Sequence, residues 1–327
     1  MPHPPQNSAT SMSERYNDHR GLFEALVDDG RQLLKLTGIG LIGAGLFAFF
    51  LGATGHFLPH DIKFLGVTAE ALYLIADARL VHFMIHDRVS FGGAILGVGA
   101  LYLWLAEFPL RAGEVWAWWA LLLSGTLGFA SFTAYLGYGY LDSWHGVATL
   151  VLLPIFSLGM YKSIRLLPNE QSIRVLFRPG WRGACLTPYG LGRSLLLVTS
   201  LCLVMGGLII MTVGMTTVFV PQDLEFMKLC VGDLEAINPR LVPLIAHDRA
   251  GFGGGVCCCG LTMFFCVYCN GPSRSLWQVL AVTGLAGFGT AIGVHYPIGY
   301  TSFIHLAPAY LGAVMFLAGM ALTYARW

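Results

Sequence analysis

Long apolar stretches separated by short polar connections make up most of this chain. An α-helix needs about 20 residues to cross the ~30 Å hydrocarbon core of a bilayer, and eight stretches approach or exceed that length. They lie near 34–57, 91–108, 115–137, 145–163, 194–220, 252–270, 276–297 and 303–325. The pattern predicts an all-α polytopic membrane protein with eight transmembrane helices.

Composition supports this prediction. Of the 327 residues, 56% are hydrophobic and only 11% are charged, whereas charged residues make up about 25% of a typical soluble domain. The lipid bilayer is therefore the main expected partner, and the net charge of +1 makes nucleic acid an unexpected one. The polar first thirty residues show no signal-peptide pattern, so we expect the first apolar stretch to be retained as a helix.

Two halves of the chain carry the same landmarks in the same order. The segment RLVHFMIHDRVSFGG, which begins at Arg79, recurs as RLVPLIAHDRAGFGG from Arg240. FLPHDIKFL recurs as FVPQDLEFM, and GYLDSWH as GYTSFIH. Because each half holds an even number of spans, the halves are expected to be parallel repeats related by an axis along the membrane normal.

This repeat predicts four regions and a fold of two parallel, pseudo-twofold four-helix bundles. The regions are a polar cytoplasmic tail (1–30), a first four-helix repeat (31–163), a basic cytoplasmic linker (164–193) and a second four-helix repeat (194–327).

The distribution of basic residues predicts the orientation. With the N-terminus in the cytoplasm, 13 of the 19 Lys and Arg residues fall on the inner side, as the positive-inside rule requires. Both termini are then cytoplasmic, and the His-Asp-Arg motifs lie on the outer side of a plasma or inner membrane.

Four histidines form a symmetric set within this topology. His86 and His247 are expected to begin the second helix of each half, and His145 and His305 the fourth. We expect His86 to face His145, and His247 to face His305, each pair inside its own bundle. Side chains on facing helices of a bundle are a common means of holding a cofactor or metal.

A haem held by two imidazoles needs opposed nitrogens, a flat space between helices and cations near its propionates. Arginines next to the histidines offer the cations, and glycines two turns further along the same helices leave space for a macrocycle edge. The candidate cofactor-binding residues are His86, His145, His247, His305, Arg88, Arg249, Gly93 and Gly254, and the four histidines are the candidate metal ligands.

Structural interpretations of the same residues stay open. The Asp-Arg pairs also suit internal salt bridges, Gly-Gly suits close helix packing, and His56, His60 and His295 suit interfacial positions. A single metal ion, or no cofactor, is the alternative to haem. Histidines four residues apart share a helix face, as zinc sites require, and the two such pairs are His56 with His60 and His82 with His86.

Eight spans in two parallel halves, with outer-face histidines on the second and fourth helices of each, resemble the architecture of the heme A synthase family. The resemblance covers roughly residues 34–325. It implies haem bound by paired histidines, one half serving a structural haem and the other a substrate haem whose methyl group is oxidised. In this chain the motif is His-Asp-Arg followed by Phe-Gly-Gly, and His82 stands where the family has Glu. The resemblance therefore implies only a cofactor-holding role for His86, His145, His247 and His305.

Three classes of function follow. The first is a haem- or metal-binding membrane protein in redox or electron transfer, an oxidoreductase with a membrane redox partner or quinone. The second is a transporter or channel built on the interface between the repeats. The third is a non-catalytic structural subunit of a larger membrane complex.

Overall fold

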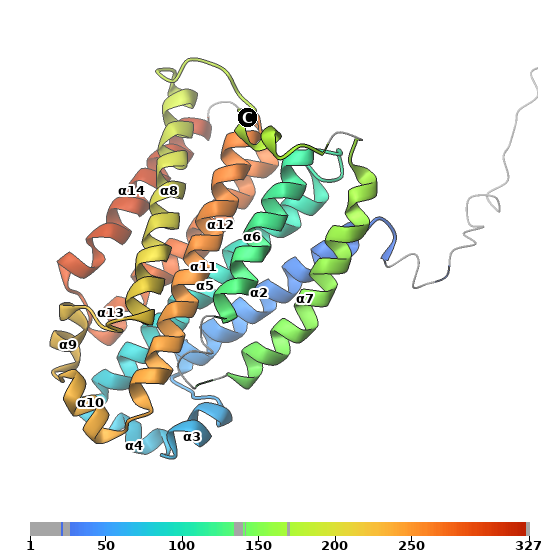
Figure 1. Cartoon of the computed structure of the whole chain (residues 1–327). Helices are drawn as coiled ribbons and strands as arrows, with labels where there is room; N and C mark the ends of the chain where they lie inside the picture. The colour runs from blue at the N-terminus through green and yellow to red at the C-terminus, as the bar shows by residue number, and fades with distance from the viewer. Residues whose placement is uncertain (1–20, 22–26, 134–139, 141, 169–170, 325–327) are drawn as a thin grey trace, which may run out of the picture.

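The computed structural model describes residues 21, 27–133, 140, 142–168 and 171–324. All regular secondary structure in these ranges is helical. Eight helices of 19 residues or more dominate the fold (Figure 1). They are α2 (Arg31–Thr54), α5 (Arg79–Glu107), α6 (Val115–Thr133), α7 (Ser143–Ser163), α8 (Pro188–Met215), α11 (Leu241–Cys269), α12 (Arg274–Gly293) and α14 (Phe303–Tyr324).

Seven of the described helices are long and apolar enough to cross a membrane, and α6 contributes a shorter apolar segment, Val115–Ser131. Helices α2, α7, α8 and α14 expose large apolar side chains, among them Phe50, Leu150 and Leu317. In contrast, α5 and α11 are buried along most of their length. Apolar side chains exposed on the outer helices suit contact with the hydrocarbon of a bilayer.

The helices of the two halves interleave. Helix α5 packs against α2 and α12, and its counterpart α11 packs against α8 and α6, while α5 and α11 contact each other. The pattern is symmetric, since α2 also contacts α7 and α8 contacts α14. The expected arrangement, in which each half packs as a bundle of its own, is not confirmed: each central helix takes a neighbour from the other half.

Short helices gather at one end of the long helices. They are α3 (Pro59–Leu65), α4 (Ala69–Tyr73), α9 (Pro221–Met227), α10 (Val231–Ile237) and α13 (His295–Ile298). The linker between α7 and α8 and the end of α14 lie at the opposite end (Figure 1).

The repeated Pro-x-Asp sequence explains how α3 and α9 begin. Pro59 and Pro221 occupy the first helical turn, where a missing N–H is tolerated. Two residues later, the carboxylates of Asp61 and Asp223 accept hydrogen bonds from the backbone N–H groups of the residues that precede the helices, at 3.4 and 2.8 Å. Both carboxylates are buried, so the local helix start also places a charge inside the protein.

Candidate metal centres and the ion-pair network

The second helix of each half begins earlier than the hydrophobic pattern predicts. Helix α5 starts at Arg79 rather than near 91, and α11 starts at Leu241 rather than near 252. His86 and His247 therefore lie about two turns inside their helices instead of at the helix starts. Their side chains are only 3% and 1% exposed.

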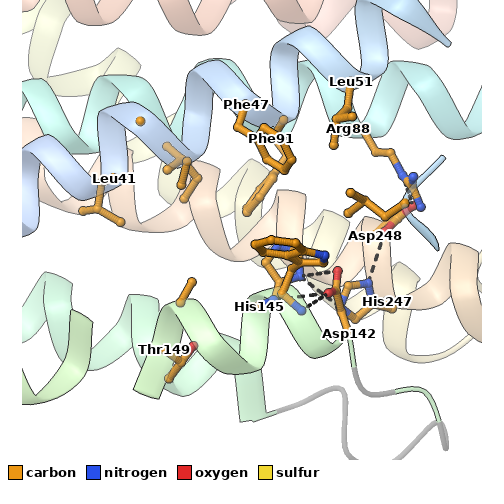
Figure 2. Close-up of a pocket in the computed structure, with 18 of the residues that line it drawn as sticks. Leu41, Phe47, Leu51, Arg88, Phe91, Asp142, His145, Thr149, His247 and Asp248 are labelled. Carbon is orange, nitrogen blue, oxygen red and sulfur yellow. Dashed lines mark hydrogen bonds and ion pairs between the residues drawn. The ribbon is translucent and has the colours of Figure 1, made fainter. Parts of the chain in front are cut away.

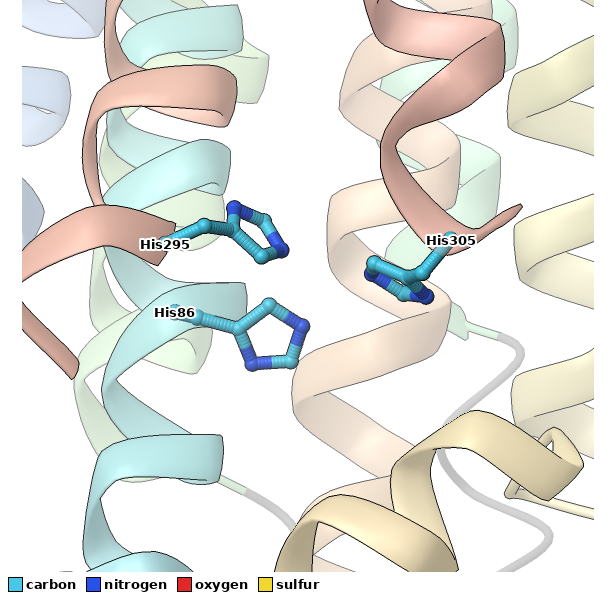
Figure 3. Close-up of side chains that lie close together, drawn as sticks. All are labelled: His86, His295 and His305. Atoms are coloured by element: carbon cyan, nitrogen blue, oxygen red, sulfur yellow. The ribbon is translucent and has the colours of Figure 1, made fainter. Parts of the chain in front are cut away.

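His86 lies in a group of three histidines, which we call the three-histidine cluster. Its partners are His295 of α13 and His305 of α14, with ring centroids 5.1 and 6.0 Å from that of His86. One ring nitrogen from each residue falls within 4.8 Å of the other two. Figure 3 shows the three imidazoles converging from three helical segments.

His247 lies in a second group, the mixed cluster, with His145 of α7 and Asp142 just before it. His145 Nδ1 is 3.4 Å from His247 Nε2 and 3.0 Å from an Asp142 oxygen. The Asp142 carboxylate also accepts hydrogen bonds from the backbone N–H groups of Trp144 and His145, which caps α7. Figure 2 shows this cluster at one end of a cavity.

The predicted pairing within each half is wrong. His86 lies with His305, and His145 lies with His247, so each cluster combines histidines from both halves. The physical reason is the interleaving of the helices, which places α14 beside α5 and α7 beside α11 at this end. The four symmetric histidines do come together in two groups, but with exchanged partners.

Arg88 and Arg249 were expected to offer cations to the propionates of a haem, but both are engaged in ion pairs inside the protein. Arg88 donates from Nε to Asp248 and from Nη1 to Asp61, both at 2.8 Å. Each of these carboxylates is nearly fully buried. The guanidinium of Arg88 is thus already paired with two carboxylates and is not available for a propionate.

Arg249 makes the symmetric arrangement. It donates to Asp223 and, from Nε at 3.4 Å, to Asp87. The Asp and Arg of one repeat therefore bind the Arg and Asp of the other, and the two crossed ion pairs join α5 to α11. The internal salt bridge considered from sequence is present, but it forms between the halves.

Two tyrosines complete the network. Tyr140 donates to Asp61, and Tyr300 donates to Asp223 at 2.7 Å. The Tyr300 hydroxyl is also 3.0 Å from His305 Nδ1, which connects the three-histidine cluster to the ion pairs. Sequence analysis did not select these residues, although both tyrosines belong to the repeated Gly-Tyr segment and both aspartates to the repeated Pro-x-Asp.

Electrostatics lower the pKa of two acidic groups, Asp142 and Asp223, that lie outside the long helices. Burial raises the pKa of Asp142, but the hydrogen bond and charge of His145, together with His247 and His60, outweigh it and hold this pKa well below its usual value. Burial likewise raises the pKa of Asp223, and the Arg249 guanidinium more than compensates. Burial and the neighbouring carboxylate raise the pKa of Tyr300, which stays a neutral donor.

Gly93 and Gly254 hold helices together instead of bordering an open space. A Cβ at Gly93 would lie 2.5 Å from the backbone oxygen of Ala286 and 1.9 Å from Oγ1 of Thr290, both on α12. A Cβ at Gly254 would lie 2.4 Å from Oγ of Ser131 on α6. The structure thus contradicts the expectation that they leave room for a macrocycle and matches the close-packing alternative.

The histidine pairs spaced by four residues do not form sites of their own among the described residues. His86 turns to the three-histidine cluster without His82, and His56 is exposed. His60 instead places Nε2 2.8 Å from an Asp142 oxygen, at the border of the mixed cluster.

Two donors in the clusters were not predicted from the sequence. His295 was assigned to the interface, yet it is 4% exposed, and neither of its ring nitrogens makes a hydrogen bond of good geometry with a described residue. Asp142 was not selected as a ligand. Neither residue is repeated in the other half, where Tyr135 and Ser302 occupy the corresponding sequence positions, and Tyr135 lies outside the described residues.

Comparison with known proteins does not assign the chain to a family: no protein-family model matches it, and searches of curated proteins and of solved structures return no match. The proposals below therefore rest on the side chains of this protein.

Proposed function

We propose that this protein is an integral membrane metalloprotein that holds a transition-metal ion in each of its two histidine clusters and serves in redox or electron transfer. The observation that carries the proposal is His295. Its imidazole is buried, and among the described residues neither ring nitrogen makes a hydrogen bond of good geometry. A buried polar group left in this way costs about 1–3 kcal/mol unless a partner is supplied. A metal ion shared with His86 and His305 supplies that partner.

The surroundings of the other histidines support the same proposal. A metal-ligating histidine commonly donates its second ring N–H to a carbonyl or carboxylate, which fixes the tautomer. His86 Nδ1 contacts the Phe83 carbonyl oxygen, and His247 Nδ1 is 3.1 Å from the Asp248 carboxylate. His86 Nε2 lies 3.4 Å from Asp87 Oδ1, and His247 Nε2 lies 3.4 Å from His145 Nδ1; a metal ion bound at Nε2 would replace these contacts.

The donor sets favour particular metals. Three imidazoles suit zinc, copper, iron or nickel, whereas two histidines and one carboxylate are the ligand set of many non-haem iron centres. Iron or copper would supply one-electron chemistry when bound. The chain itself holds the ion, fixes the imidazole tautomers and keeps Asp142 ionised.

A metal ion fits these residues better than haem does. His145 and His247 already lie 3.4 Å apart through their ring nitrogens, less than the ~4 Å spanned by two metal–nitrogen bonds of ~2.0 Å on opposite sides of one ion. The arginines expected to hold propionates are each paired with two carboxylates. Haem between these histidines would require the rings to separate and the ion pairs to open.

The crossed ion pairs favour a second candidate, a structural subunit in which the repeated His-Asp-Arg motif only joins the two halves. Arg249 is nearly buried between Asp87 and Asp223, which is sufficient for such a role without a metal. Metal content separates the two candidates.

The decisive experiment is metal analysis of the full-length protein purified in detergent, combined with an optical spectrum. We expect one ion per cluster and no Soret band. His295→Leu and Asp142→Ser should each lose one ion, while His56→Ala, at an exposed position outside both clusters, should keep both. A metal-free protein that is stable and homogeneous would contradict the proposal, and a Soret band lost in His145→Ala would replace it with haem.

The proposal includes eight membrane spans, cytoplasmic termini and outward-facing clusters. Two of the three exposed cysteines report on this orientation, because Cys230 lies beside α10 at the cluster end and Cys185 lies in the linker at the other end, whereas Cys202 lies within the apolar helix α8. In intact cells, an impermeant thiol reagent should modify Cys230 and spare Cys185. Modification of Cys185 alone would reverse the orientation.

A further inference from the structure

A cavity of about 410 Å³ extends from the mixed cluster along α2, α5 and α7 (Figure 2). This volume falls within the range of small-molecule sites. Its walls are apolar over most of their length and include Leu41, Phe47, Ile95 and Leu152. The charged side chains lie at the end at which Asp142 and His145 are found, and the hydroxyl of Thr149 lies further along α7 (Figure 2).

The charges at that end define the head group that fits. The polar end includes the carboxylates of Asp61, Asp142 and Asp248, and a single guanidinium, that of Arg88, which two of them already bind. Three carboxyl groups therefore share this end with one guanidinium, an arrangement that disfavours an anionic head group, whereas a neutral hydroxyl can donate a hydrogen bond to an Asp142 oxygen. The formal charges of these three carboxylates and one guanidinium add up to −2, and a divalent ion in the mixed cluster would bring that total to zero. A neutral hydroxyl group therefore fits with or without metal.

The cavity borders the surface that faces lipid. Phe47 lines it and is 46% exposed, and Gly43, also in the lining, is exposed as well. An apolar molecule in the bilayer therefore reaches the cavity laterally along α2, without passing through water.

Small residues on α2 leave this space. The two halves align through equivalent contacts, since Gly45 packs on α5 as Gly207 packs on α11. In this alignment Gly43 corresponds to Met205, and Ala48 to Ile210. The first half thus has smaller side chains at two positions on α2 that line the cavity, while at Ala44, Phe47 and Leu51 it has larger ones than Gly206, Ile209 and Val213. Gly43 and Ala48 are the positions at which the residues of the second half would fill the cavity.

We propose that this cavity binds a neutral lipophile from the membrane, with an apolar chain along α2 and α7 and a hydroxyl head group at Asp142 and His145. Aliphatic alcohols and phenolic quinols share this chemistry. This ligand is distinct from the proposed metal ions. Its binding follows from the shape of the cavity and the charged side chains at one end, whether or not a metal is bound.

Photolabelling tests the site. The probe is a hexadecanol carrying a diazirine in its chain, applied to the purified full-length protein in detergent, and labelled peptides are located by mass spectrometry. We expect saturable labelling of α2 and α7. Unlabelled hexadecanol should compete at least about 10-fold better than hexadecanoate, a difference of about 1.4 kcal/mol. Competition by a decyl hydroquinone distinguishes a flat phenolic head group from an aliphatic one.

Variants that introduce the residues of the second half provide the control. Gly43→Met has room for its Cβ, because nothing lies within 4 Å of that position, and together with Ala48→Ile it should reduce labelling about 10-fold. Phe50→Thr, an exchange for the corresponding residue at a lipid-facing position outside the cavity lining, should leave labelling unchanged. The proposal would be overturned if the wild type, the Gly43→Met/Ala48→Ile variant and the Phe50→Thr variant were labelled equally. Equal competition by hexadecanoate and hexadecanol would also overturn it. Chelator-treated protein should label equally well, which separates this test from that of the metal.

Discussion

The three-histidine cluster and the mixed cluster are two versions of one duplicated arrangement. Each contains a histidine from α5 or α11, a histidine from α14 or α7, and an ion-paired Asp–Arg–Asp group beside it. They differ in the third donor, which is the buried His295 in one and Asp142 in the other. The paired network has been kept in both halves, while the residue that completes each donor set has changed.

The two clusters also differ in how open their surroundings are. The mixed cluster opens into the cavity along α2, and the His145 side chain is 31% exposed. In the three-histidine cluster the counterpart of His145, His305, is 20% exposed, whereas His86 and its counterpart His247 are both buried, at 3% and 1%. The cavity therefore accounts for most of the difference between the clusters. We infer that the enclosed cluster suits a permanently held ion, whereas the open one suits contact with a ligand.

The largest expected effect comes from removing a central arginine. Arg249→Leu leaves Asp87 and Asp223 buried without their partner, which should lower the free energy of unfolding by about 3–5 kcal/mol. Arg88→Leu should cost less, because the Arg88 side chain is 14% exposed and that of Arg249 is 6%. Unfolding in mixed micelles measures both.

A surface arginine is the matched control for this comparison. Arg111 pairs with Glu107 but its side chain is 65% exposed, so Arg111→Leu should change stability by less than about 1 kcal/mol. Equal losses for Arg88 and Arg249 would show that the two halves are equally enclosed.

The tyrosines test whether the network supports both clusters equally. Tyr300→Phe removes a hydrogen bond to the charged Asp223 and a contact with His305, so the expected loss is about 1.5–3 kcal/mol. Tyr140→Phe removes only the hydrogen bond to Asp61 and should lower stability by less. Metal content of the two variants adds a second measurement, because only Tyr300 contacts a proposed ligand through its hydroxyl. Equal metal loss in both would argue that the hydroxyl of Tyr300 does not orient His305.

Duplication explains how much of these sites the sequence predicts. The repeat singled out His86, His145, His247 and His305, and all four belong to the clusters. His295 escaped because it has no identical counterpart, so repetition gave it no weight.

The sequence also did not predict that histidines of different halves pair with each other. Hydrophobic periodicity shows which face of a helix is buried, but α5 and α11 are buried on nearly all sides, so their pattern does not select a neighbour. The helix content followed from the length of the apolar stretches, whereas the helix starts did not, because the polar His-Asp-Arg motif interrupts the apolar pattern inside a continuous helix.

The motif glycines offer a smaller test of the same symmetry. Gly93→Ala forces a Cβ against a backbone oxygen of α12, which cannot rotate away, and should cost about 1–3 kcal/mol. Gly254→Ala meets both Oγ and Cβ of Ser131, at 2.4 and 2.6 Å. Rotation of the Ser131 side chain moves Oγ but not Cβ, so the helices must separate slightly and the loss should be of similar size. Gly206→Ala, with nothing within 4 Å, should be neutral or stabilising. Metal content should not change in any of them, and a selective loss of metal in Gly254→Ala would restore a role for that glycine near the cofactor.

His295→Leu gives a small expected change in the stability of the metal-free protein, and the sign of the change depends on the metal. In metal-free protein the substitution removes a buried imidazole that makes no hydrogen bond of good geometry with a described residue and replaces it with an apolar side chain, so stability should rise by about 1 kcal/mol. In metal-loaded protein the same substitution removes a ligand, and the stabilisation by bound ion is lost for that cluster. Unfolding measured before and after chelation should therefore show opposite shifts for His295→Leu, whereas His56→Ala should shift in neither condition. A stabilising effect in both conditions would mean that His295 is an unpaired core residue and that the three-histidine cluster holds no ion.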